Sequence, residues 1–390
     1  MNKTKITIIG LIIYLAATGV SYFAFAKTPL GKSLTSTSSV PSNAKVDNDY
    51  QALTFDQNAP KTESCPLNGA MYSKDQKSWW EKHRPLGVMI ENHSEARPQS
   101  GINAADITYE AVAEGGITRT LNVFYCNDSG IVGPVRSART YFLDFISEYT
   151  ENPLYAHVGG ANTPGPADAL GQINEYGWGS YNDLNQFSIG YPTYWRDQTR
   201  QGHDVATEHT MYSSTSKLWD VGAQRKLTNV DKDGAAWDKD FVKYSFKDDA
   251  ASSSRPANQA IHIEFWNDPS YYVDWTYSPK DNMYLRNNGG VPHIDRNTKK
   301  QLITKNVVVL FMTEQHAKDG YENNAHMLYG TKGSGKAFIF MDGKQIKGTW
   351  KKSGRQDRTI ISDNSGNEVK FDKGKIWFEV QATDGVVTVK

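Results

Sequence analysis

The sequence has no excess of either charge. Its 43 Lys and Arg residues are balanced by 43 Asp and Glu residues. A chain without net charge has no general electrostatic attraction to nucleic acid or to an anionic membrane surface. We therefore expect no nucleic-acid partner, and an anion would have to bind at a local cluster of basic side chains.

Cysteine is scarce. Cys65 and Cys126 are the two in the chain, and neither has a second Cys or a His at the spacing of a zinc site. In an oxidising compartment an even number of cysteines is compatible with a disulfide. The sequence leaves open a Cys65–Cys126 bridge and the alternative of two unrelated thiols.

Several enzyme signatures are missing. The sequence has no phosphate-binding glycine loop, and no G-x-S-x-G elbow supports Ser137 as a nucleophile. The spacing of His203 and His209 in "QGHDVATEHTMY" matches no compact helical metal site. We predict no metal and no cofactor, and the sequence does not decide whether the protein is an enzyme.

A long uncharged run is present at the N-terminus. Lys3 and Lys5 precede residues 6–26, which are long enough to span a bilayer. The end of the run, "AFAK", also has the small-x-small pattern of a signal-peptidase site after Ala26. Residues 1–26 are therefore expected to be a transmembrane anchor or a signal peptide. In both cases the rest of the protein lies outside the cytoplasm, either anchored to the cell membrane or secreted.

Residues 27–62 are rich in Ser, Thr, Asn, Pro and Lys. Such a segment has too little apolar surface to offset the entropy of ordering the chain. We expect a disordered tether, and a flexible coil of about 35 residues reaches roughly 30 Å.

Beyond the tether, the pattern predicts an α+β fold in two domains. A mixed α/β domain is expected over 63–245 and a small β-rich domain over 246–390, with the boundary in the charged and Ser-rich stretch 223–259. Strands of the first domain are predicted at 86–91, 106–111, 117–125 and 154–158. In the second domain, strand-like runs such as "NVVVLFM" and "KIWFEV" alternate with turns, and Asp342-Gly343 predicts a hairpin.

Two helices are predicted in the first domain. Apolar side chains recur at helical spacing in "YFLDFISEY". In "GPADALGQINEYG", Pro166 near the first turn and Gly177 at the end delimit a second helix. Residues 159–203 lack periodicity and are expected to form a long loop. Its aromatic part, "YGWGSYNDLNQFSIGYPTYWRD", could stack on sugar rings or fill a core of its own.

The stretch "GPVRSART" places Arg136 and Arg139 just before the first of these helices. Ser137 is expected to cap the helix and Arg139 to lie in its first turn, where free backbone N–H groups favour an anion. Arginine binds carboxylate and phosphate groups through paired hydrogen bonds. The alternative is that the arginines form salt bridges with the protein's own Glu110 or Glu114.

A second cluster is "YEAVAEGGITR". Gly115-Gly116 permits a tight turn, with Glu114 before it and Arg119 after it. Arg119 joins Arg136 and Arg139 as a candidate ligand-binding residue, with a hairpin carrying solvated charges as the alternative.

Histidines supply the remaining candidates for catalysis. His157 ends a predicted strand in "LYAHVGG", and His209 has Glu208 nearby as an orienting partner. Glu114, His157 and His209 are the candidate general bases, with a structural histidine as the alternative for the latter two.

The sequence resembles the YerB-like lipoprotein family, whose two parts are domains of unknown function. The resemblance is carried by "RPLGVMIENHSEARPQSGINAADITYEAVAEGGITR", "GPVRSART", "YAHVGG", "EHTMYSS", "NVVVLFM", "GSGKAFIFMDGKQIKGTWKK" and "KGKIWFEV". It implies an extracytoplasmic, membrane-associated protein with an α+β domain and a β-rich domain, and it implies no reaction. No cysteine stands at the end of the hydrophobic run, so the uncleaved helix would replace a lipid as the anchor.

Three hypotheses follow. The preferred one is a cell-envelope protein that binds an anionic small molecule, peptide or cell-wall ligand through Arg119, Arg136, Ser137 and Arg139. The second is an envelope hydrolase with Glu114 or His157 as general base and the arginines stabilising developing charge. The third is a scaffold protein whose arginines pair internally.

Overall fold

The structure, a computed structural model, describes residues 51–390. The predicted membrane segment 1–26 and most of the tether 27–62 lie outside these residues. Within residues 51–390, no helix combines the length and the apolar character needed to cross a membrane. The described residues belong to one packed unit.

A ten-stranded mixed sheet runs through both halves of the chain, in the order β22-β21-β20-β17-β24-β4-β5-β3-β7-β8. Its strands are β22 (Ile360–Asp363), β21 (Lys344–Lys352), β20 (Gly333–Met341), β17 (Asn306–Met312), β24 (Ile376–Ala382), β4 (Ile107–Glu114), β5 (Ile117–Phe124), β3 (Leu86–Glu91), β7 (Leu154–His157) and β8 (Asp183–Asn185). β24 pairs in parallel with β4, from Ile376 opposite Ile107 to Glu379 opposite Glu110. The two halves are therefore joined by backbone hydrogen bonds.

A second sheet of six strands is formed entirely by the C-terminal half. Its members are β15 (Val291–Pro292), β14 (Met283–Asn288), β13 (Val273–Ser278), β12 (Ala260–Ile263), β25 (Val387–Val389) and β16 (Ile303–Thr304). Buried and partly exposed side chains alternate along β13 and β14, as expected for a sheet with one covered face.

Three two-stranded sheets and one three-stranded sheet complete the β structure of residues 51–390. They are β1 (Glu63–Ser64) with β2 (Met71–Tyr72), β10 (Met211–Ser214) with β6 (Ile131–Val132) and β9 (Trp195–Arg196), β11 (Phe246–Lys247) with β23 (Phe371–Asp372), and β18 (Glu314–His316) with β19 (Met327–Tyr329).

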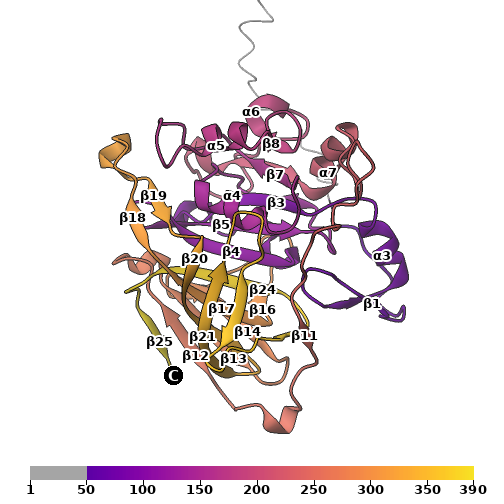
Figure 1. Cartoon of the computed structure of the whole chain (residues 1–390), viewed down its shortest axis with the longest axis vertical. Helices are drawn as coiled ribbons and strands as arrows, with labels where there is room; N and C mark the ends of the chain where they lie inside the picture. Colours follow the sequence, from indigo (N-terminus) through magenta and orange to yellow (C-terminus); the bar gives the residue numbers. More distant parts are fainter. Residues whose placement is uncertain (1–50) are drawn as a thin grey trace, which may run out of the picture. The chain divides into compact units, whose positions relative to one another are not determined.

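Within residues 51–390, the α-helices come from the N-terminal half and the C-terminal half contributes mainly strands. The helices are α3 (Lys74–Trp80), α4 (Thr140–Ile146), α5 (Ala169–Glu175), α6 (Gln186–Ile189) and α7 (Thr215–Gln224). Figure 1 shows α4, α5, α6 and α7 around β3, β7 and β8. The predicted α+β fold with a β-rich C-terminal part is therefore confirmed.

The four strands predicted in the N-terminal half correspond to β4, β5, β3 and β7. The "NVVVLFM" run is β17, and Asp342-Gly343 forms the β20–β21 hairpin turn with positive φ at both residues. The expected loop 159–203 instead contains the short elements α5, β8, α6 and β9. Their lengths of two to seven residues are too short to give a periodic sequence signal.

The helix predicted after "GPVRSART" is α4, but its start differs from the prediction. Arg139 is the N-cap residue, in extended conformation (φ −137°, ψ 147°), and no side chain caps the helix. Ser137 is therefore not the cap, and Arg139 is not in the first turn. The reason is that the backbone N–H of Ala138 still donates to the carbonyl of Gly159 at 2.9 Å, which keeps the chain extended up to the helix. Pro166 likewise precedes α5, whose cap is Asp168.

The two faces of the ten-stranded sheet are covered differently. On one face the ring of Tyr109 lies between Phe145 of α4 and Phe378 of β24, with centroids 4.6 and 4.7 Å away. On the other, Trp377 of β24 meets Trp275 of β13 edge to face at 5.2 Å. We call these the helix-covered face and the sheet-covered face.

An ion-pair cluster lies on the sheet-covered face, where the two halves meet. The guanidinium of Arg286 on β14 donates to Glu110 at 2.6 Å and to Glu379 at 2.8 Å, and all three side chains are fully buried. Arg286 also lies over the Trp377 ring at 4.5 Å. Burial raises the pKa of Glu379; Arg286 opposes that rise and the neighbouring Glu110 adds to it. Two carboxylates thus share one cation.

Candidate functional site

The stretch 133–139 is held in place by its own backbone. The N–H of Arg136 donates to the carbonyl of Met89 at 2.9 Å, and the N–H of Val158 donates to the carbonyl of Arg136 at 3.1 Å. The segment therefore lies between the C-terminal ends of β3 and β7. This places the arginine side chains on the helix-covered face, beside the acidic end of β3.

Arg119 and Arg139 are neutralised by one carboxylate. Arg119 donates to Glu114 at 2.9 Å, and Arg139 donates to the other oxygen of the same carboxylate. The two arginines are 1% and 5% exposed, and burial lowers the pKa of both guanidinium groups. This arrangement is the internal pairing that the sequence left open as an alternative.

A β-bulge explains why Glu114 reaches these arginines. β4 and β5 pair as Val112 with Thr118 and then as Glu114 with Ile117, so Ala113 is an extra residue. Residues paired across strands share a face, and Ile117 shares its face with Arg119. Without the bulge Glu114 would point to the opposite face. Glu110, the other expected partner, does point there and pairs with Arg286.

Arg136 differs from its two neighbours because it remains partly exposed, at 25% of its side chain. Its Nε donates to Glu91 at 3.1 Å, and the other oxygen of Glu91 lies 2.8 Å from Nδ1 of His209. Burial alone would raise the pKa of Glu91, but the hydrogen bond from His209 and the charge of Arg136 hold it below its usual value. The Nη groups of Arg136 make no hydrogen bond to any side chain or carbonyl within residues 51–390.

Arg136 and Ser137 line a cavity of about 690 Å³. Phe187 of α6 and Asn185, the residue just before α6, also line the cavity. Figure 1 shows where α6 lies, near α5 and β8. The Phe187 side chain is 72% exposed. A Cβ atom on Gly159 would come within 3.0 Å of its ring, so the glycine lets the ring lie against the backbone.

Arg196 of β9 is the second cation on the cavity wall. It forms no ion pair within residues 51–390, and its Nη1 donates to neutral acceptors, the carbonyl of Thr207 and the hydroxyl of Thr210. Burial and then the charge of Arg136 lower the pKa of Arg196, which indicates that the two guanidinium groups repel each other. Glu208 is the one carboxylate on the wall beside the two guanidinium groups, and its charge partly offsets the effect of Arg136 on Arg196.

The candidate general bases are already engaged. Glu114 is bound by two arginines. His157 is fully buried, with Nδ1 2.7 Å from the carbonyl of Gly159 and Nε2 2.5 Å from Asp183. His209 shares Glu91 with Arg136, and this hydrogen bond raises its pKa. Neither Glu114 nor His157 has a free atom facing a cavity, so this geometry gives the hydrolase hypothesis no support.

Cys65 and Cys126 are bonded to each other, with an S–S distance of 2.09 Å, and they are 61 positions apart in the sequence. The bridge fastens the segment before α3 to the end of β5. Both sulfur atoms are consumed by the bond, and no free cysteine remains in residues 51–390.

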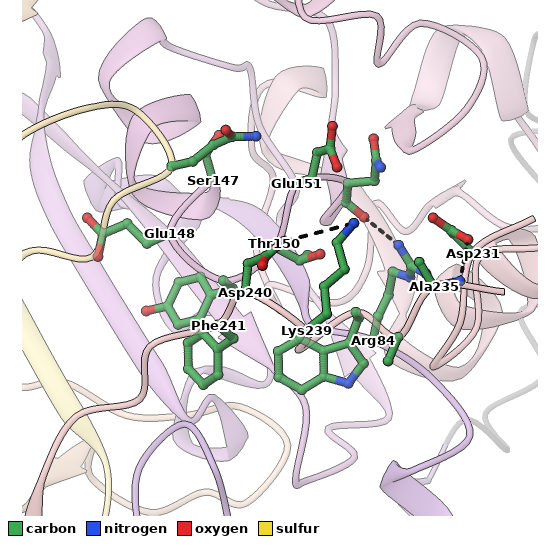
Figure 2. Close-up of a pocket in the computed structure, with 15 residues that line it drawn as sticks. Arg84, Ser147, Glu148, Thr150, Glu151, Asp231, Ala235, Lys239, Asp240 and Phe241 are labelled. Carbon is green, nitrogen blue, oxygen red and sulfur yellow. Dashed lines mark hydrogen bonds and ion pairs between the residues drawn. The ribbon is translucent and has the colours of Figure 1, made fainter. Parts of the chain in front are cut away.

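A second pocket, of about 230 Å³, contains another buried arginine, Arg84 (Figure 2). Its guanidinium donates to the backbone carbonyls of Thr228 and Asn152. The residues that line this pocket with Arg84 and Lys239 include the carboxylates of Glu148, Glu151, Asp231 and Asp240, which Figure 2 labels. With acids outnumbering bases, this pocket does not suit an anion.

The sequence analysis missed Arg196, Glu91 and Asn185. Arg196 and Asn185 lie in the aromatic-rich stretch, where the rings rather than the polar residues give the sequence signal. Glu91 gives no such signal, because a glutamate at a strand end is ordinary until the fold places it between Arg136 and His209.

Comparison with known families resolves where the chain belongs. Residues 70–228 match the family described as "Protein of unknown function (DUF3048) N-terminal domain", and residues 261–378 match its "C-terminal domain". The chain belongs to the DUF3048 family. The resemblance noted in the sequence is thereby confirmed.

The chain is also similar to a protein from Bacillus subtilis. The protein named "Putative lipoprotein YerB" in strain 168 is 29% identical over 304 residues, which cover 77% of this chain and 81% of that protein. The crystal structure of the YerB protein from Bacillus subtilis matches with a TM-score of 0.68 at 23% identity, over 84% of this chain and 99% of the other. This likeness shows that the two proteins share a fold.

Both ion-pair regions belong to the matched part of this DUF3048 protein. The arginines at 119, 136, 139 and 196 lie within residues 70–228, and Arg286 lies within residues 261–378. The cavity is built from the N-terminal domain alone.

Proposed function

We propose that this protein binds the anionic group of a cell-envelope ligand, a carboxylate or a phosphate, in the cavity lined by Arg136 and Arg196. The observation that carries the proposal is that Arg196 lies on the cavity wall with no ion pair to residues 51–390, next to a second, partly exposed arginine. An anion between the two would relieve their repulsion and accept charge-assisted hydrogen bonds.

The other walls of the cavity fit a ligand that is only partly charged. Ser137 and Asn185 offer polar groups, and the exposed ring of Phe187 offers a flat apolar surface. A few polar groups beside an aromatic ring are typical of small-molecule sites. A cell-wall peptide or a sugar bearing a carboxylate has both kinds of surface.

The proposed role of the sequence candidates changes accordingly. Arg136 and Ser137 remain ligand-binding residues, and Arg196 joins them. Arg119 and Arg139 act as support, because their pairing with Glu114 fixes the segment that carries Arg136. Arg119 does so directly, since its Nη1 donates to the carbonyl of Ser137 at 3.1 Å.

The place of binding is the outer side of the cell membrane. The relative's name, lipoprotein, supports a membrane-anchored protein outside the cytoplasm. In this chain the uncharged run 6–26 would supply the anchor in place of a lipid, and secretion after cleavage at Ala26 is the alternative.

The test is binding of defined anions to the purified full chain. Soluble cell-wall muropeptides and inorganic phosphate are titrated by calorimetry into the wild type and into Arg136→Ala and Arg196→Ala. Each lost charge-assisted hydrogen bond is expected to cost about 1.5 to 3 kcal/mol, or roughly ten- to hundredfold in affinity.

Arg200→Ala is the matched control. Arg200 lies close to Arg196 in sequence, but it donates to Ser100 and Asn297, away from this cavity. Its loss should leave affinity unchanged. Equal affinity of the wild type and both cavity variants for every probe would overturn the proposal.

A further inference from the structure

A group of metal-ligating side chains lies on the far side of Glu91 from Arg136. His93, Glu95 and His209 each offer one ligand atom, and these atoms all lie within 4.8 Å of one another. Nε2 of His209 is 3.6 Å from a carboxylate oxygen of Glu95. The two imidazole rings are nearly parallel, with centroids 4.7 Å apart. Three donors of the kinds that bind zinc thus lie close together. Because the stacked imidazoles hold their lone pairs in nearly parallel planes, one ring would rotate to share an ion with the other.

We infer that His93, Glu95 and His209 form a binding site for a divalent transition metal of the zinc class. Two imidazoles with one carboxylate are an established zinc ligand set that leaves a fourth position open to water or to a ligand oxygen. Imidazole donors favour zinc over the hard cations magnesium and calcium, which prefer oxygen. The inference does not depend on the proposed anion binding.

The strongest support comes from the group behind His209. Its Nδ1 lies 2.8 Å from Glu91, where the ring donates a proton, and this leaves Nε2, 3.6 Å from Glu95, as the nitrogen that binds a metal once it has lost its own proton. A carboxylate that fixes the tautomer of a ligating histidine in this way is the usual outer shell of a zinc site. Glu91 is itself held by Arg136 at 3.1 Å, so its position is fixed on both oxygens.

The other two donors are accessible. The Glu95 side chain is 53% exposed, and His93 is half-buried. Nδ1 of His93 accepts a 3.2 Å hydrogen bond from the backbone N–H of Glu95. A metal at the other ring nitrogen would require the ring proton to move to Nδ1, and this one bond on a surface loop would be lost.

The local electrostatics allow a dication but do not demand one. Glu91 is offset by Arg136, which leaves Glu95 as the net negative charge among the ligands. Arg97, the next cation along the loop, is turned away and donates to the carbonyl of Ser270 and to Asn92. We therefore expect reversible binding rather than a permanently filled site.

This site could not be predicted from the sequence. The absence of a metal was predicted because the spacing of His203 and His209, the two histidines considered together, matches no compact metal site. Glu91 and His209 are 118 residues apart, and the fold brings 3₁₀ turns η1 (Ser94–Ala96) and η3 (Thr207–His209) together. The exposed His203 is not part of the group. The pattern "ENHSE" supplies the other two ligands and the orienting glutamate within five residues.

The experiment uses the purified full chain, stripped of metal with a chelator. Zn²⁺ is titrated in competition with a chromophoric chelator, and Co²⁺ serves as an optical probe whose visible absorption reports nitrogen coordination. The wild type is expected to bind one equivalent of Zn²⁺ and to ignore Mg²⁺. Glu91→Gln removes only the orienting group and should lose about ten- to hundredfold in affinity. His93→Ala and His209→Ala remove a ligand and should each lose more than that.

His203→Ala is the matched control, an exposed histidine from the same stretch as His209, and it should keep wild-type affinity. Residues 1–50 contain no histidine or cysteine and cannot supply the same donors. His93→Ala and Glu95→Gln alter accessible side chains, so they keep the test valid if His209→Ala does not fold. Absence of Zn²⁺ binding by the wild type, or equal affinity in His93→Ala and His203→Ala, would overturn the inference.

Discussion

The two faces of the ten-stranded sheet use arginine in opposite ways. On the sheet-covered face, Arg286 lies between Glu110 and Glu379 with no exposed surface. On the helix-covered face, Arg136 has one carboxylate partner and a quarter of its side chain exposed beside a cavity. The first arrangement uses all its charges internally, whereas the second leaves a cation available. Burial and the number of carboxylates, rather than the residue type, separate a structural arginine from a candidate for binding.

Removal of each arginine gives the largest expected contrast. Arg286→Ala leaves two buried carboxylates without their cation and should lower the free energy of unfolding by about 3 to 5 kcal/mol. Arg136→Ala leaves Glu91 bonded to His209 and should cost about 1 kcal/mol or less, as for a partly exposed pair. Chemical denaturation of the two variants measures both values. Similar losses would remove the distinction between the faces.

Glu114 tests the intermediate case, in which two buried arginines share one carboxylate. Glu114→Gln removes the negative charge but keeps the size of the side chain. We expect a loss of about 2 to 3 kcal/mol, because two buried cations lose their charged acceptor, while the 21% exposed position admits some water. Denaturation of this variant should fall between the other two. A loss below that of Arg136→Ala would mean that Arg119 and Arg139 do not depend on Glu114.

The sequence predicted individual strands of the large sheet but not how the strands of the two halves pair. Strands with continuous apolar runs, such as β3 and β17, were predicted at their observed bounds, because nearly every residue in them is buried. The pairing of β24 with β4 was not predictable, since it joins residues about 270 apart and depends on the packing of both halves. The ion pairs of Arg286 with Glu110 and Glu379 could not be predicted for the same reason.

The candidate site shows a similar division. Arg136 and Ser137 were found because a basic pair before a helix is locally unusual. Their environment was not found, since Glu91, Arg196 and Phe187 come from three other elements. The internal pairing of Arg119 and Arg139 depends on a one-residue bulge at Ala113, which shifts a single side chain across the sheet. A sequence pattern of period two predicts strands well and fails where such a bulge changes the face.

The smallest expected effect is on how the free energy of unfolding depends on pH. One buried glutamate on each face has a shifted pKa, and the two shifts, at Glu379 and Glu91, have opposite directions. The pKa of Glu379 is raised above its usual 4.5, so the stability it contributes is complete at low pH and is lost as pH rises through the raised value. The pKa of Glu91 is lowered, so its contribution is present above 4.5 and is lost as pH falls through the lowered value.

A pKa that differs by one between the folded and unfolded chain changes the free energy of unfolding by about 1.4 kcal/mol, so differences of this order should appear between wild type and variant. Measured from acid to alkaline pH, the wild type should lose stability relative to Glu379→Gln and gain stability relative to Glu91→Gln. The two slopes have opposite signs because Glu379 competes with Glu110 for one cation, whereas Glu91 has both Arg136 and His209. Slopes of the same sign would mean that burial of the carboxylate, and not the ratio of cations to carboxylates, sets the direction of the glutamate pKa shift on both faces.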